Sequence, residues 1–261
     1  MRSLDIGATG MLAQQMHVDV ISQNIANMTT TGFKRQRPEF KDLMYQNIVR
    51  PGASGADADT IVPSGLQLGL GVKAGSVYRI HEQGTIKITE NPLDLALNGD
   101  GFFQIELPNG ETAYTRDGIF QLNQDGEIVT TQGFRLMPGF TVPADTIDIS
   151  ISNQGLVQAK VQGQVNMQNL GQIELANFIN PAGLEAIGDN LLLETEASGP
   201  AVEGTPGEDN FASIRQGSVE NSNVNVVEEI TNLITAQRSY ELNSKVISTS
   251  DEMLGTITQM R

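Results

Sequence analysis

The chain has 261 residues with no cysteine or tryptophan, and its 31 acidic and 16 basic residues give a formal net charge of −15. The absence of cysteine excludes disulfides, thiolate metal sites and cysteine nucleophiles, and it suits a reducing compartment or a chain that crosses an oxidising one unfolded. No stretch approaches the roughly 18 apolar residues of a membrane span, and polar residues interrupt the N-terminal region too often for a cleaved signal peptide.

The negative charge is concentrated in the middle of the chain. Residues 1–31 have a net charge of −1 and residues 223–261 of −2, so residues 32–222 carry −12. One short segment, 34–41, is basic, with four basic residues against a single acidic one. We expect no nucleic-acid partner, because phosphate binding needs a basic surface wider than eight residues.

Residues 1–34 are predicted to form a helical N-terminal end. Leu4, Met11, Val18 and Ile25 recur every seven residues, with Ile21 near a half-repeat, which is typical of an amphipathic helix with coiled-coil character. The stretch SQNIANMTTTGFKR (22–35) is free of charge until Lys34 and rich in Asn and Thr. We expect the helix to end at Gly32, after three β-branched threonines.

Residues 35–70 are expected to connect this helix to a sheet. The stretch RPGASGADADTIVPSG (50–65) has the composition of a long loop. A second such stretch, ASGPAVEGTPGED, occupies residues 197–209.

Residues 71–221 are predicted to form a mainly antiparallel β domain. Apolar residues there alternate with polar ones, or run for five to seven residues, and turn sequences at 107–111, 122–127 and 152–156 separate such runs. Asn-Gly, Asp-Gly and Gln-Gly dipeptides in this setting are hairpin signals.

Residues 222–261 are predicted to form a second long helix, opened by a capping box at Asn225 and Glu228. Its apolar residues follow two stripes rather than one, and two stripes predict at least two neighbouring elements. The fold class is therefore α+β, with terminal helices that form a coiled-coil-like core domain beside the β domain. The residues that we expect to form a self-assembly core are Leu4, Met11, Val18, Ile21, Ile25, Ile230, Leu233, Tyr240, Ile247, Met253 and Ile257.

The residues give little support to an enzyme. His17 and His81 are the only histidines, and neither belongs to a recognisable catalytic or metal-binding constellation. The stretch GLGVKA (69–74) matches a relaxed dinucleotide-binding pattern, but a strand-like sequence follows where a helix is required. The stretch NQDG (123–126) resembles part of a calcium loop without its flanking carboxylates, so a hairpin turn is the better interpretation. We expect no catalytic residue, cofactor or metal.

The opening of the chain closely resembles the signature of bacterial flagellar rod and hook proteins. The matching positions are Asn24, Ala26, Asn27, Thr31, Gly32, Phe33 and Lys34. The C-terminal stretch from Ser222 to Asn243 and the middle stretches 91–105 and 113–130 also resemble that family, so the resemblance covers nearly the whole chain. Within the family, residues 45–72 resemble the form of this segment in distal-rod members.

The resemblance implies a structural subunit that polymerises into a rigid helical tube, with its terminal helices lining the core and its β domain facing outward. Such a tube crosses the periplasm in the flagellar basal body and transmits motor torque to the hook. The implied partners are further copies of the chain, the proximal rod proteins, the hook protein, the surrounding P and L rings, and the export apparatus, which exports such subunits without a cleaved signal peptide.

This family also suggests why residues 22–31 lack charge: neighbouring subunits would surround the end of the helix. Phe33 would then anchor the chain as it leaves the core, and the basic 34–41 segment would meet acidic surface on the same or a neighbouring subunit. The alternatives are a hook or proximal rod protein of the same family and, more remotely, an oligomeric carbohydrate-binding β protein.

Overall fold

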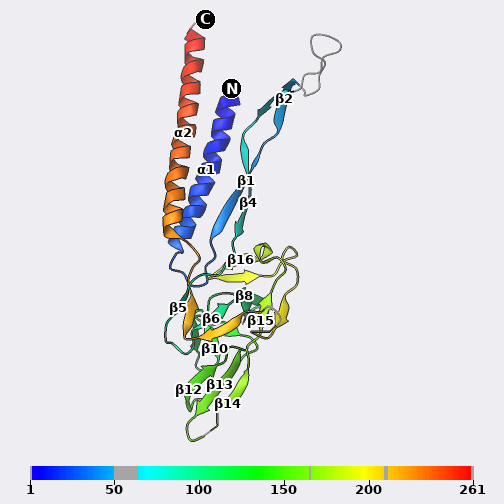
Figure 1. The fold of residues 1–261 in the computed structure, drawn as a ribbon, viewed down its shortest axis with the longest axis vertical. Coiled ribbons are helices and arrows are strands. Elements are labelled where there is room, and N and C mark those ends of the chain that lie inside the picture. The colour runs from blue at the N-terminus through cyan, green and yellow to red at the C-terminus, as the bar shows by residue number, and fades with distance from the viewer. Residues whose placement is uncertain (1, 50–63, 165, 209–210, 260–261) are drawn as a thin grey trace. The chain divides into compact units, whose positions relative to one another are not determined.

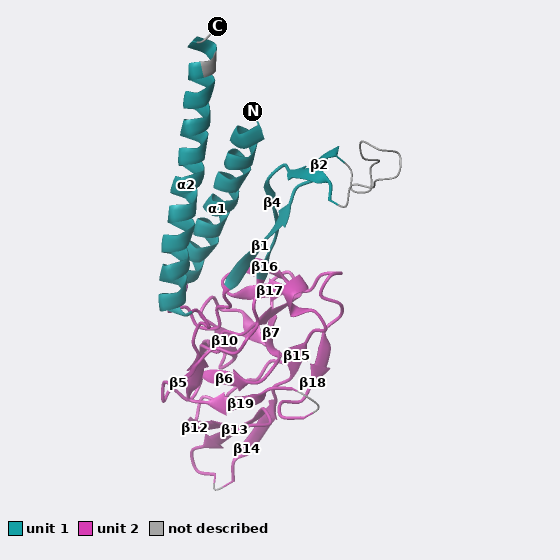
Figure 2. Cartoon of the chain, turned by 45° about the horizontal axis from the view of Figure 1, so that its top comes forward, with its two compact units in different colours: residues 1–25, 36–78, 225–261 teal, residues 26–35, 79–224 magenta. Residues whose placement is uncertain are grey.

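The computed structural model describes residues 2–49, 64–164, 166–208 and 211–259. The chain divides into two compact units (Figure 2). Unit 1 comprises residues 1–25, 36–78 and 225–261, and unit 2 comprises residues 26–35 and 79–224. The loop predicted at 50–65 lies mostly outside the described residues.

Unit 1 contains two helices and two small antiparallel ladders (Figure 1). The helices are α1 (Arg2–Ala26) and α2 (Val226–Gln259), which lie side by side and antiparallel in Figures 1 and 2. Strand β1 (Gln36–Asp42) pairs with β4 (Val72–Arg79), and β2 (Tyr45–Val49) pairs with β3 (Leu66–Gly69).

The helix bounds differ from the prediction at one end. The prediction that the N-terminal helix continues to Gly32 is wrong. Helix α1 ends at Ala26, and residues 27–32 form turns and a bend. Helix α2 begins where the capping signal places it, because the Asn225 side-chain oxygen accepts a hydrogen bond from the Val227 N–H at 3.2 Å.

Unit 2 is built almost entirely from short antiparallel strands. Its largest sheet has nine strands, in the order β16-β17-β8-β7-β11-β10-β9, with β15 paired to both β7 and β18. A three-stranded sheet, β12-β13-β14, and the pairs β19-β6 and β20-β5 complete the unit. The strands are β5 (Ile86–Ile88), β6 (Leu95–Asn98), β7 (Phe102–Glu106), β8 (Thr112–Thr115), β9 (Phe120–Leu122), β10 (Ile128–Thr130), β11 (Arg135–Leu136), β12 (Thr146–Ile151), β13 (Leu156–Val161), β14 (Gln168–Gln172), β15 (Leu175–Asn177), β16 (Glu185–Gly188), β17 (Leu191–Leu193), β18 (Val202–Gly204), β19 (Ser213–Gln216) and β20 (Ser218–Glu220), with a 3-10 turn, η1 (Pro181–Gly183).

The turn sequences form hairpins as predicted. The Leu107 N–H donates to the Glu111 carbonyl, Asn123 to Glu127 and Ser152 to Leu156, at 2.9, 3.0 and 3.0 Å. The mainly antiparallel sheets confirm the α+β class. The second predicted loop, 197–209, is partly wrong, because β18 lies inside it and pairs with β15.

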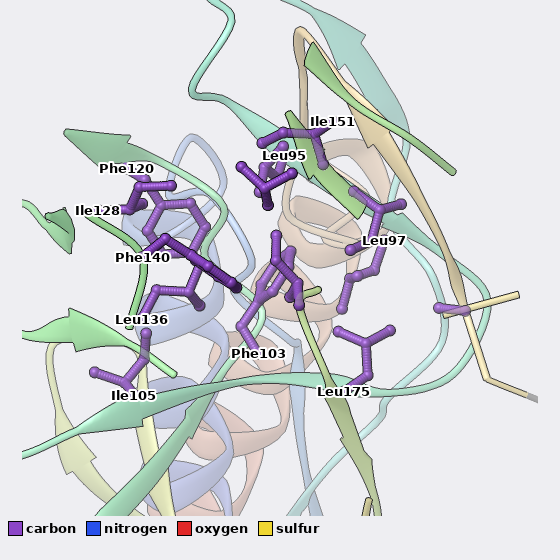
Figure 3. Close-up of a cluster of buried hydrophobic side chains, with 14 of the residues drawn as sticks. Leu95, Leu97, Phe103, Ile105, Phe120, Ile128, Leu136, Phe140, Ile151 and Leu175 are labelled. Carbon is purple, nitrogen blue, oxygen red and sulfur yellow. The ribbon is translucent and has the colours of Figure 1, made fainter. Parts of the chain in front are cut away.

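The core of unit 2 lies between these sheets (Figure 3). Phe103 and Phe120 meet edge to face, with ring centroids 5.3 Å apart, and the same cluster contains buried aliphatic residues from β6, β7 and β11. A second cluster contains Phe102, Tyr114 and Phe178 and lies on the opposite face of the sheet, because Phe102 and Phe103 are successive residues of β7. Unit 2 therefore has a core of its own.

Candidate functional site

Helices α1 and α2 approach closely at two glycines of α1. An added Cβ on Gly7 would lie 2.9 Å from Ile247 Cγ1, and one on Gly10 would lie 2.9 Å from Asn243 Nδ2. A larger side chain at Gly7 would displace Ile247, and one at Gly10 would displace the amide group of Asn243. The fully buried positions of α2, Glu229, Ala236 and Ser250, share this face with Asn243 at seven-residue intervals.

Apolar side chains of α2 also lie outside the face that α1 covers. They form two exposed groups, one from Val227 to Ile234 and the other from Leu242 to Met253. Leu242 is 65% exposed and Met253 is 55% exposed, and a contiguous exposed apolar patch often marks an interaction site. Leu242, Val246 and Met253, which belong to the second predicted stripe, are thus uncovered in the single chain.

The structure places the sequence-predicted assembly residues in three environments. Ile21 is buried within unit 1, whereas the half-buried ones are Leu4, Met11, Val18, Ile25, Leu233 and Ile247. Ile230, Tyr240 and Met253 are exposed. The side chain of Ile257 lies outside the described part of the chain.

Helix α1 also lies against the first ladder of unit 1. The Asn24 side chain bonds to both backbone groups of Gln36, at 2.8 and 2.9 Å, and the His17 ring meets the Phe40 ring edge to face at 6.2 Å. Burial lowers the pKa of His17. Closer to the N-terminus of α1, Leu12 and Met16 border a hollow of about 510 Å³ that reaches Leu43.

Signature residues 26–35 belong to unit 2 and are tied into it at several points. The Thr31 hydroxyl donates to Asp117 at 2.9 Å, and the Gly32 N–H donates to the Glu220 carbonyl at 2.9 Å. Gly32 has φ +68°, and an added Cβ would lie 2.6 Å from the Arg116 carbonyl carbon. Only glycine fits both that conformation and that space. Thr31 and Gly32 are therefore held by contacts within unit 2 of the same chain.

A buried ion pair holds the end of this segment. Lys34 Nζ lies 2.6 Å from Glu220 Oε1, and Arg116 NH1 lies 3.1 Å from Glu220 Oε2, with all three side chains at most 5% exposed. The Gly84 N–H adds a third donor to Glu220 at 2.8 Å. Burial lowers the pKa of Lys34 and of Arg116, and the Glu220 carboxylate opposes both shifts.

The described residues offer no group of three or more histidine and acidic side chains that could hold a metal ion. The NQDG stretch forms the β9–β10 hairpin, in which the Asn123 side chain accepts hydrogen bonds from the N–H groups of Asp125 and Glu127. The GLGVKA stretch spans the end of β3 and the start of β4. Over the same described residues, neither helix is long and apolar enough to cross a membrane.

Three family models match separate parts of the chain. Residues 4–34 match "Flagella basal body rod protein", residues 96–159 match "Flagellar hook protein FlgE/F/G D1 domain", and residues 215–260 match "Flagellar basal body rod FlgEFG protein C-terminal". A relative from Caulobacter vibrioides, "Flagellar basal-body rod protein FlgG", is 58% identical over 261 residues and covers 100% of both chains. The chain belongs to the flagellar basal-body rod protein family.

More distant flagellar proteins also align over the full length. The "Flagellar basal-body rod protein FlgG" of Bacillus subtilis is 40% identical and covers 100% of this chain and 99% of its own. "Flagellar hook-basal body complex protein FlhP" of the same organism is 32% identical and covers 100% of both. As a member of the rod protein family, the chain is a structural component of the flagellar basal body and not an enzyme.

Sequence reasoning missed the partners of the family signature. Arg116 and Glu220 are 82 and 186 residues away from Lys34 along the chain, and no local pattern links them to it. Glu220 closes a short strand-like stretch, SVE, and its nearest charged neighbour along the chain is Arg215. A single acidic residue in such a stretch does not reveal that it is buried.

Proposed function

We propose that the protein is the distal-rod member of this family, and that identical copies assemble into a rigid helical tube that transmits motor torque through the periplasm to the hook. The resemblance of residues 45–72 to distal-rod proteins supports the distal assignment, as do the full-length relatives named as rod proteins. The remaining alternatives are a hook protein, which would form curved tubes, and a proximal rod protein of the same family. The carbohydrate-binding alternative has lost its support, because full-length relatives are flagellar proteins.

The terminal helices form the coiled-coil-like core of the proposed tube. The observation that carries this proposal is the uncovered apolar surface of α2, above all Leu242, Val246 and Met253. Each side chain of this size contributes about 1.5–3 kcal/mol when it moves from water into a fully buried site. Helices of neighbouring copies would cover these side chains, together with exposed Leu12 of α1. The partly buried Leu233 and Ile247 would hold α2 against α1 within each subunit.

The remaining partners follow from the place of such a tube in the basal body. One end would join proximal rod proteins, the other end the hook protein, and the β units would face the P and L rings. The subunits would reach the growing tube through the flagellar export apparatus without a cleaved signal peptide.

Electron microscopy of the purified full chain tests this proposal. Concentrated protein is expected to form straight tubes, whereas a hook protein would form curved ones. Leu242→Asp should remove the tubes, because a carboxylate buried between helices costs several kcal/mol. Ser244→Asp places the same carboxylate on α2 at an exposed polar position and should leave the tubes intact. Equal polymerisation of both variants would show that this face of α2 is not part of the core.

A further inference from the structure

The basic segment 34–41 divides into two parts that serve different ends. Lys34 belongs to unit 2, where its side chain forms the buried ion pair with Glu220. Arg37 and Lys41 lie further along, on β1 of unit 1, and both are exposed. The alternation of burial along β1 explains this separation, because successive side chains of a strand point to opposite faces.

The two faces of the β1–β4 ladder are clearly distinguished. Gln36, Pro38 and Phe40 are half-buried, and Phe40 meets His17 of α1. The opposite face carries Arg37, Glu39 and Lys41.

Lys73 of β4 extends this second face. The Lys41 side chain crosses Gly75, where an added Cβ would lie 3.3 Å from both its Cγ and its Cε. Lys73 stands two residues before Gly75 and therefore shares that face. With Arg37, Glu39 and Lys41, the face has a net charge of +2. None of its three basic side chains lies within ion-pair distance of an acidic side chain in the described part of the chain.

This basic face belongs to a chain that is otherwise acidic. Unit 2 contains 20 acidic and 8 basic residues, a net charge of −12. Among the described residues from 166 to 208 there are seven acidic residues and no lysine, arginine or histidine. Glu185, Glu194 and Glu203 of this stretch are exposed on or beside β16, β17 and β18. We call residues 166–208 the acidic stretch.

Copies with a net charge of −15 repel one another unless their contacts join surfaces of opposite sign. We propose that the basic face of the β1–β4 ladder, which carries Arg37, Lys41 and Lys73, binds the acidic stretch of a second copy of the chain. This inference rests on the proposed self-assembly and adds the pair of surfaces that sets the register between neighbours. Complementary charges across an interface supply register and rejection of wrong arrangements more than affinity.

Charge reversal in the full chain tests the basic face. Arg37→Glu combined with Lys41→Glu should raise the lowest concentration that supports tubes at least about tenfold, because like charges would then face each other. The control, Lys87→Glu with Lys160→Glu, changes the net charge by the same amount at two exposed lysines of unit 2. It should raise that concentration by much less. The neutral variant Arg37→Gln with Lys41→Gln removes both charges without introducing repulsive ones. It should lose most of the salt dependence of assembly that the wild type shows.

Zero-length cross-linking identifies the occupant. A carbodiimide joins a lysine amine to a carboxylate in contact with it, so tubes grown from an equal mixture of 15N-labelled and unlabelled chain report links between subunits. Mass spectrometry should find Lys41 or Lys73 joined to an acidic residue of the acidic stretch, in peptides that combine labelled and unlabelled partners.

Links confined to one subunit, or to acidic residues of α2, would overturn the inference. Equal assembly of the charge-reversal variant and its control would also overturn it, and would leave the proposed function intact. A wild-type chain that stays monomeric at every concentration would overturn both.

Discussion

Replacing Glu220 should destabilise unit 2 far more than replacing its partner Lys34. Glu220 is 1% exposed and is the single carboxylate bonded to both Lys34 and Arg116. Glu220→Gln keeps the size and one acceptor oxygen but leaves two buried cations without their counter-charge. Lys34→Met instead leaves Arg116 and Glu220 as a neutral pair, still supported by the Gly84 N–H.

The expected magnitudes follow from this asymmetry. Removing one partner of a buried ion pair costs about 3–5 kcal/mol, so we expect a loss of that size for Glu220→Gln and about 1–3 kcal/mol for Lys34→Met. A loss of 3–5 kcal/mol lowers the melting temperature of a unit of this size by about 6–20 °C. The double variant should lose less than the sum of the two, because Lys34→Met removes one of the uncompensated cations.

Urea unfolding of the dilute, unassembled chain, followed by the β signal in circular dichroism, measures these differences. Hydrogen exchange at the Gly32 amide adds a local readout, because that N–H donates to the Glu220 carbonyl. The control is Glu82→Gln, which removes an exposed carboxylate 3.6 Å from Arg35 and should cost less than about 1 kcal/mol. If Lys34→Met costs as much as Glu220→Gln, Glu220 is not the charge on which this cluster depends.

Two further changes test unit 2. Burial, reinforced by nearby cationic side chains, lowers the pKa of His81 to about 4, below its ordinary value of 6.5. The folded state therefore resists protonation of His81. The contribution of neutral His81 to the free energy of unfolding is complete above pH 6.5 and falls by about 3 kcal/mol as the pH drops to 4. His81→Phe should remove that part of the pH dependence of unfolding, and an unchanged profile would contradict the assignment. Gly32→Ala should cost several kcal/mol in the same assay, because of its φ of +68° and the 2.6 Å approach to Arg116. Gly110→Ala, with φ +82° and nothing within 4 Å of the added Cβ, should show only the backbone cost of about 1–2 kcal/mol. Similar losses at both glycines would show that Gly32 is not confined by packing.

Local patterns were sufficient to predict most elements of the fold. The seven-residue recurrence of α1, the Asn225 cap of α2 and the Asn-Gly and Asp-Gly hairpins all depend on residues a few positions apart. Strands without strong alternation escaped prediction, as with β1, whose sequence QRPEFKD is polar and contains a proline. Its place beside β4 depends on partners more than thirty residues away, which a window of sequence does not show.

The charge-free stretch 22–31 shows where sequence reasoning stops. Its missing charge suggested that neighbouring subunits cover it, but part of it is already covered within one chain. Asn24 is 1% exposed and satisfies both backbone groups of Gln36, and Thr31 bonds to Asp117. Met28, 42% exposed, remains free for a neighbouring subunit. A polar, uncharged sequence is what either environment selects, because both require hydrogen bonds without the desolvation of an ion. Composition can therefore reveal that a surface is covered, whereas only the fold reveals which part the same chain covers.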